Sequence, residues 1–190
     1  MVAKANERSS WGEDIFSLGL QEILGAEAYK KLMSLCGGDR ASVAPVSRNM
    51  QELYGPGGAR GLLICSGRAA FKYLLKQEGK SLGFDTPQFR LLPSRSKLKR
   101  GLHQIADWMQ RSSGDTVTMV SEEKHWLYQV ADGAARNSES KENNCDFTVG
   151  LLQEFLSWAG GGKFYRVKES TCRHDGAACC TFIIDKFPLE

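Results

Sequence analysis

The sequence predicts an α/β (α+β) fold in which an antiparallel sheet of about four strands packs against helices. Apolar residues recur at helical spacing through much of the first 111 residues, and short runs of β-branched and aromatic residues follow. Those runs form two strand–turn–strand pairs, at 116–130 and 163–186, which favours antiparallel pairing. A chain of 190 residues is long enough to bury the core of one such domain.

Four helical stretches are expected along the chain. Residues 15–35 carry apolar side chains at helical spacing and predict one or two helices, which end at Gly37 and Gly38. A second stretch covers about 60–77, and a third covers about 96–111, with Gly114 at its end. The fourth runs from Cys145 to Ala159, after Asn143 or Asn144 as cap, and stops at the glycines 160–162.

Strands are expected at 116–120 and 126–130, and again at 163–171 and 180–186. The polar segment 132–144 between the pairs predicts a surface loop. We expect one compact domain overall, in which residues 1–58 form an N-terminal helical segment and residues 59–190 form the main domain, whose family resemblance is given below.

Composition excludes some classes of function. A net charge of +3 is too small to predict nucleic-acid binding, and no apolar run is long enough to cross a membrane. The N-terminus has no apolar segment typical of a secretion signal, so we expect a cytoplasmic protein. In that compartment the six cysteines predict metal ligands or buried thiols rather than disulfides.

Four side chains near the C-terminus form the sharpest motif. Cys172 and Cys180 flank a turn between two strands, Glu169 precedes Cys172, and Cys145 begins the preceding helix. Thiolates with one carboxylate suit a closed tetrahedral zinc site. The alternative is a hairpin with buried thiols and no metal. Glu169 and Cys172 would point to opposite faces of a regular strand, so the site requires a bend or bulge between them.

The segment from Cys145 to Gly150, followed by Phe164 to Ile184 with its Glu169-Ser170-Thr171-Cys172 motif, resembles the C-terminal half of the 4-vinyl-reductase domain family. That resemblance implies a fold related to transport-particle (TRAPP) subunits and to nitric-oxide sensors of the haem type. It also implies zinc bound by Cys145, Glu169, Cys172 and Cys180, with Cys179 as an alternative to Cys180. A homodimer is implied too, and small residues at 67, 69 and 70 would let a partner helix approach closely.

The family resemblance further implies a binding module, a sensor or carrier, for a small hydrophobic or aromatic molecule held between the sheet and the helices. The expected lining residues are Trp126, Tyr128, Phe164, Trp108 and His103. Two alternatives stay open: a carrier or reductase-associated protein for a tetrapyrrole, and an assembly subunit that acts through its dimer surface. No dinucleotide, P-loop, nucleophile-elbow or metalloprotease motif supports catalysis.

Overall fold

The computed structural model of the chain describes residues 13–36, 43–133 and 145–189. The first helical stretch forms two helices, α1 (Glu13–Leu24) and α2 (Ala26–Leu35). Gly25 separates them with a φ of 77°, a left-handed conformation that glycine adopts without a Cβ penalty. The expected end at Gly37 and Gly38 and the expected loop at 134–144 lie outside the described residues.

Helix α3 (Val43–Glu78) begins well before the predicted start near residue 60. Its first part ends at Gly55, where φ is 70°, and Pro56 opens the second part, because proline fits the first turn of a helix. The predicted boundary between the N-terminal segment 1–58 and the main domain 59–190 falls inside this helix. That division stays a prediction. Within the described ranges, no helix is both long and apolar enough to cross a membrane.

The rest of the order is α4 (Pro87–Arg90), α5 (Ser94–Ser113), β1 (Thr116–Ser121), β2 (His125–Ala131), α6 (Cys145–Ala159), β3 (Val167–Thr171) and β4 (Cys179–Asp185). Gly114 ends α5 with a φ of 73°, as expected. The strand predicted from residue 163 begins at Val167 instead. The backbone of Phe164 bonds to Leu189, beyond the end of β4, and not to the strand ladder.

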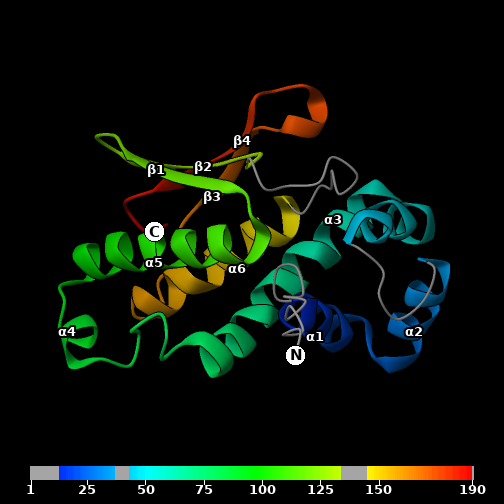
Figure 1. Cartoon of the computed structure of the whole chain (residues 1–190), viewed down its shortest axis with the longest axis horizontal. Helices are drawn as coiled ribbons and strands as arrows, with labels where there is room; N and C mark the ends of the chain where they lie inside the picture. Colours follow the sequence, from blue (N-terminus) through cyan, green and yellow to red (C-terminus); the bar gives the residue numbers. More distant parts are fainter. Residues whose placement is uncertain (1–12, 37–42, 134–144, 190) are drawn as a thin grey trace, which may run out of the picture.

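The four strands form one antiparallel sheet in the order β1-β2-β4-β3, which confirms the predicted fold class. Helices α5 and α6 lie against one face of this sheet, and α3 crosses on the other side of α6 (Figure 1). Along β2, buried and half-buried residues alternate, as a sheet with one covered face requires. The core between the layers holds fully buried aromatic side chains, namely Trp126, Tyr128, Phe147, Phe155 and Phe182.

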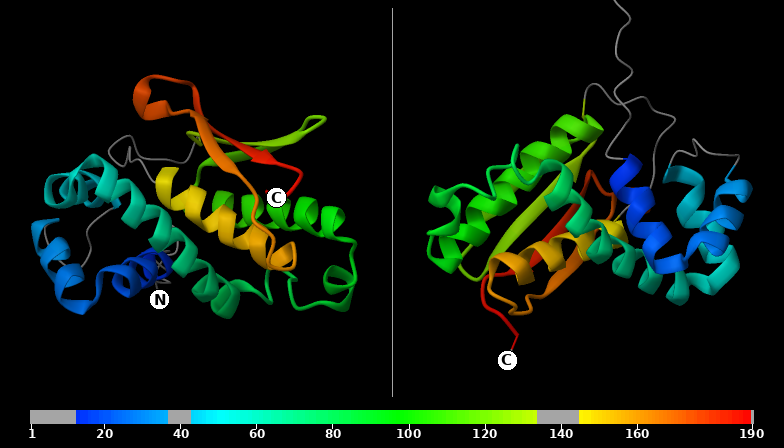
Figure 2. Two further views of the ribbon diagram at one scale, coloured as in Figure 1. Left: turned by 180° about the vertical axis from the view of Figure 1, so that it is seen from behind. Right: turned by 90° about the horizontal axis from the view of Figure 1, so that it is seen from below.

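Helices α3 and α6 run past each other in close contact (Figure 2). A Cβ atom at Gly67 would collide with the backbone of Phe147 and Leu151, and one at Gly150 would collide with the backbone of Ile64 and Arg68. Glycine at both positions therefore lets the two backbones touch. Of the small residues predicted to face a second copy, Gly67 serves this contact inside the chain, Ala70 is buried beside Gly19 of α1, and Ala69 is half-buried.

Candidate metal centre

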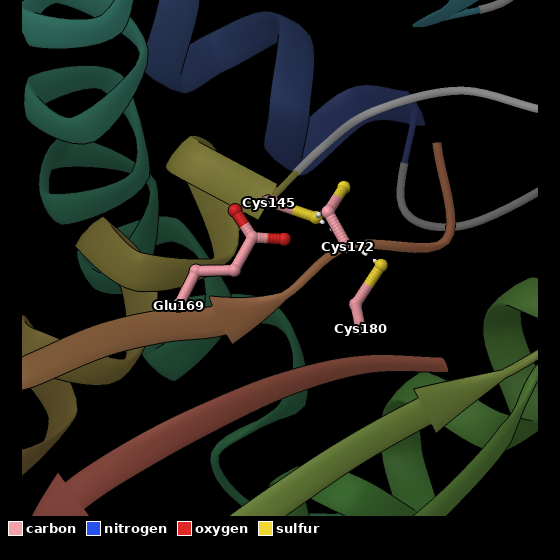
Figure 3. Close-up of side chains that lie close together, drawn as sticks. All are labelled: Cys145, Glu169, Cys172 and Cys180. Carbon is pink, nitrogen blue, oxygen red and sulfur yellow. Dashed lines mark hydrogen bonds between the residues drawn. The ribbon is translucent and has the colours of Figure 1, made fainter. Parts of the chain in front are cut away.

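Three elements bring the four predicted ligands together (Figure 3). Cys145 is the first residue of α6, Glu169 lies in β3, Cys172 directly follows β3, and Cys180 lies in β4. One sulfur or oxygen atom from each lies within 4.8 Å of the other three. The three cysteines are buried and Glu169 is half-buried, so the cluster lies mostly out of solvent.

A bulge in β3 allows Glu169 and Cys172, which would point to opposite faces of a regular strand, to reach the same side of the sheet. Glu169 is paired with Phe182, yet Thr171 is paired with Thr181, so the ladder shifts by one residue between them. Ser170 is the extra residue, and its hydroxyl donates to the carbonyl of Thr181 at 3.2 Å. Glu169 and the residue after the strand, Cys172, therefore reach the same side of the sheet, and the predicted bulge is confirmed.

The turn after β3 returns the chain to the cluster. A short 3-10 helix (Arg173–Asp175) follows Cys172, and Gly176 closes it with a φ of 92°. The backbone N–H of Ala177 then donates to the carbonyl of Cys172 at 3.2 Å, which places β4 beside Cys172. Cys180 joins the cluster, whereas the half-buried Cys179 lies outside it with its sulfur 3.5 Å from the hydroxyl of Thr181.

Hydrogen bonds within the cluster shift the pKa values of Cys145 and Cys180 in opposite directions. The Cys145 thiol donates to the sulfur of Cys180 at 3.4 Å. This bond, with a backbone N–H donated by Arg173 at 3.5 Å, lowers the pKa of Cys180 from 9.0 to about 6. The same bond to Cys180, then burial and the nearby Glu169, raises the pKa of Cys145 far above its ordinary value. Without a metal, the pair therefore holds one thiolate and one thiol at neutral pH.

The Glu169 carboxylate supplies the most direct indication that the cluster suits a cation. Its Oε1 atom is buried and has no hydrogen-bond partner. A buried carboxylate oxygen without a donor costs free energy, and a cation at the centre of the cluster would remove that cost. The donor set of three sulfurs and one oxygen fits a single transition-metal ion that binds thiolate.

Arg173 is a neighbouring residue that the sequence analysis missed. Its guanidinium donates to Asp115 at 3.1 Å and to Asp132 at 2.6 Å, and its side chain is only 13% exposed. Asp115 directly precedes β1 and Asp132 directly follows β2, so one side chain fastens the β3–β4 turn to the other hairpin. The two carboxylates are 58 and 41 residues from Arg173, and no local spacing indicates such a contact.

The five predicted pocket residues do not lie in one place. Trp126, Tyr128 and Trp108 are buried in the core, 1%, 0% and 4% exposed, and the Tyr128 hydroxyl donates to the sulfur of Met109 at 3.1 Å. Burial raises the pKa of Tyr128 well above its ordinary value. Phe164 is 59% exposed, and His103 lies exposed on α5. A pocket lined by these residues stays a prediction.

Comparison with known proteins establishes the fold. No family model matches the chain, and no curated protein matches it. Among solved structures it is similar to the Fe(II) unliganded H-NOX protein from K. algicida, with 12% identity and a TM-score of 0.60 over 93% of this chain and 96% of that one. An H-NOX protein from S. oneidensis in the Fe(II)NO ligation state gives 13% identity and a TM-score of 0.59 over 90% and 97%.

This chain has the H-NOX fold. The predicted relationship to nitric-oxide sensor domains is therefore confirmed at the level of fold. Membership of the 4-vinyl-reductase family is not shown by these comparisons. A third similar structure, from a study of haem distortion in the H-NOX family, gives 16% identity and a TM-score of 0.51 over 95% of this chain and 89% of that one.

The comparisons contradict the predicted cofactor, zinc. The similar solved structures with the H-NOX fold are described by Fe(II) states and by haem, and not by zinc. The prediction was wrong because it transferred a metal identity from a local motif, while the motif itself specifies only a donor set.

The cluster of four donors does not fit haem iron either. Haem iron has at most two axial positions for protein ligands, so at least two of the four crowded donors would be left without a metal bond. Of the histidine side chains that the structure describes, His103 is exposed, and His125 is 39% exposed and pairs with Asp185 at 3.4 Å. The cluster suits one compact ion held by all four side chains.

Proposed function

We propose that this chain is a binding module, a sensor or carrier for a small hydrophobic or aromatic molecule, whose C-terminal elements are held together by one metal ion. The observation that carries the metal part is the four-donor cluster within 4.8 Å, with its buried and unpaired carboxylate oxygen. We also propose that the chain is a distant member of the 4-vinyl-reductase family, on the resemblance of residues 145–150 and 164–184.

The metal would act on the structure rather than on a substrate. Four protein ligands fill a tetrahedral coordination shell and leave no open position for a reacting water. The bound ion would join the start of α6 to the end of β3 and to β4, two strands that already pair with each other in the sheet. Metal binding to thiolates and a carboxylate adds directly to folding free energy.

The fold supports the small-molecule part. The H-NOX structures are described by their ligation states, Fe(II)NO and Fe(II)CO among them, so this fold holds a small-molecule ligand through a bound group in those proteins. We infer that this chain uses the same architecture for a ligand of its own.

Metal content is measured first, by elemental analysis and native mass spectrometry of protein purified without chelator. We expect one metal ion per chain, and the same measurement identifies the ion. Cys172→Ser and Cys180→Ser should each lose it, and Glu169→Gln should retain it less tightly. Cys179→Ser is the matched control, because Cys179 is adjacent to Cys180 and lies outside the cluster. Wild-type protein without stoichiometric metal would refute the site.

The small-molecule part is tested separately by thermal shift. A ligand at 100 times its Kd should add about 2.7 kcal/mol of stability. A screen of phenols, fatty acids and porphyrins that leaves the melting temperature of the metal-loaded protein unchanged would refute the binding module.

Tetrapyrrole binding is the second candidate, favoured by the haem of the similar H-NOX structure. It predicts a visible absorption band in freshly purified protein, or one that develops on addition of a porphyrin. Colourless protein that is stabilised by phenols or fatty acids, and not by porphyrins, supports the first candidate instead.

A further inference from the structure

An open groove of about 490 Å³ follows the outward face of α3. Helix α3 packs against both α1 and α6 (Figure 2). The groove takes lining residues from all three helices. Positions 65, 68, 69, 72 and 75 of α3 line it, which is the spacing of one helix face. The groove therefore lies outside the core layer that the sequence indicated as the pocket.

The apolar part of the groove is a fixed aromatic surface. Trp158 of α6 is 42% exposed, whereas Trp108 and Trp126 are buried. The indole ring lies against Phe71, Phe84 and Phe89, with ring centres 5.7, 5.5 and 6.1 Å away. These contacts hold Trp158 in place, so it can stack on an apolar molecule with little loss of side-chain entropy.

Aliphatic side chains continue this surface. Ile23 of α1 and Leu75 of α3 line the same groove and are only half-buried, and the small Ala69 leaves room between them. A ligand in the groove would cover apolar surface that now faces water, which is favourable at roughly 25 cal/mol per Å².

The charged lining consists of two cations one helical turn apart, Arg68 and Lys72, and the carboxylate of Glu154. Arg68 contacts Glu154 at 3.0 Å, and Lys72 contacts Glu22 at 2.6 Å. The bond to Glu22 raises the pKa of Lys72, so the amine stays charged at neutral pH. Both pairs are exposed to solvent, and exposed pairs of this kind contribute little to stability. A carboxylate from a ligand can therefore join or replace Glu154 and Glu22 at low cost.

We propose that this groove binds an amphipathic organic acid, with its aromatic or aliphatic body on Trp158, Leu75 and Ile23 and its carboxylate between Arg68 and Lys72. The proposal rests on the proposed function, a module for a small hydrophobic molecule, and gives that molecule a place and a chemical class. Charge-assisted bonds from the guanidinium and the amine select the acid over a neutral molecule of the same shape.

Isothermal titration with 2-naphthoate and its neutral analogue 2-naphthamide tests the proposal on the full-length, metal-loaded chain. Wild-type protein should bind naphthoate about tenfold more tightly than naphthamide. The double variant Arg68→Gln/Lys72→Gln should lose this preference and still bind naphthamide. Lys76→Gln is the matched control, because Lys76 is exposed on the same helix and does not line the groove. Its preference should equal that of the wild type.

The indole N–H signals in a nitrogen–proton NMR spectrum give a second measurement that needs no folding-sensitive variant. Naphthoate should shift the Trp158 signal, identified with Trp158→Phe, and leave the Trp108 and Trp126 signals in place. Ala69→Trp, which fills the groove, should abolish binding of both probes.

The outcomes separate the groove from the binding function. If naphthoate or another screened acid binds with unchanged affinity to the double variant and to Ala69→Trp, the groove proposal is wrong and the binding module survives. If no aromatic or aliphatic compound binds wild-type protein, both are wrong. A dimer in light scattering that Ala69→Trp converts to monomer would show that a second copy occupies the groove, and would also overturn the proposal.

Discussion

The contact between α3 and α6 makes a sharp prediction for two glycines. In Gly67→Ala the new methyl group would lie within 3.0 Å of the backbone of Phe147 and Leu151. Side chains can rotate away from such a collision, but backbone cannot, so the helices must separate. Gly61→Ala is the matched control: it lies in the same helix, and a Cβ there meets nothing within 4 Å.

The magnitude follows from two opposing effects. Alanine favours a helix over glycine by about 0.8–1 kcal/mol at either position. Forcing a methyl group into a close-packed contact costs about 1–3 kcal/mol, and more where backbone must move. We therefore expect Gly61→Ala to be slightly more stable than wild type and Gly67→Ala to be clearly less stable, with a gap of about 1–3 kcal/mol between them.

Urea unfolding followed by circular dichroism measures this gap. Gly150→Ala, which meets the backbone of Ile64, should behave like Gly67→Ala, and the double variant should cost less than the two single costs together, because one separation of the helices relieves both collisions. Since Cys145 begins α6, both variants should also bind metal less tightly. Equal stability of Gly61→Ala and Gly67→Ala would refute the close contact.

Three further predictions concern the rest of the chain. In protein treated with chelator, the free energy of unfolding should rise from about pH 6 to pH 9. The folded-state pKa of Cys180 is lowered to about 6 from its ordinary value of 9.0, so the unfolded state binds more protons in this range. Cys180→Ser should flatten that rise in urea titrations, and a rise that persists would contradict the assignment. Arg173→Met should lower the free energy of unfolding by about 1–3 kcal/mol, since it removes a buried partner of Asp115. The control Arg166→Met, at an exposed ion pair with Asp185, should change it by less than about 0.5 kcal/mol. Similar losses in both variants would count against the Arg173–Asp115 ion pair. The homodimer implied by the family resemblance predicts twice the chain mass in light scattering at micromolar concentration, and a monomeric mass would reject it.

Local patterns in the sequence predicted most of the elements. The helix expected at about 96–111 is α5, which buries Leu98, Leu102, Ile105 and Met109 and ends at Gly114 as expected. The bounds of α6 agree with the prediction because apolar spacing and the glycines after Ala159 mark them. The first part of α3 was not assigned, because Gly55 and Pro56 interrupt the pattern, and the structure has a kink between the two parts at Gly55.

In the candidate site too, local features could be predicted from the sequence, and contacts between distant residues could not. Its four ligands could be proposed from one motif, since Glu169, Cys172 and Cys180 are joined by one strand, one turn and the next strand. The metal identity could not, because a donor set is compatible with several ions. Contacts across the chain were also missed: nothing near Arg173 in the sequence indicates that Asp115 and Asp132 meet it.

The position of β4 in the sheet sets the order in which this chain can fold during synthesis. It leaves the ribosome after the other three strands of the sheet, yet it lies between β2 and β3, which do not pair with each other. Until β4 arrives, the β1–β2 hairpin has an open edge and β3 has no neighbour in the sheet, a state that invites pairing with other chains. Cys180 arrives on the same strand. Closing the sheet and assembling the four candidate ligands are therefore one late event. Under the proposed metal binding, metal supply is then a condition for folding as well as for the finished protein.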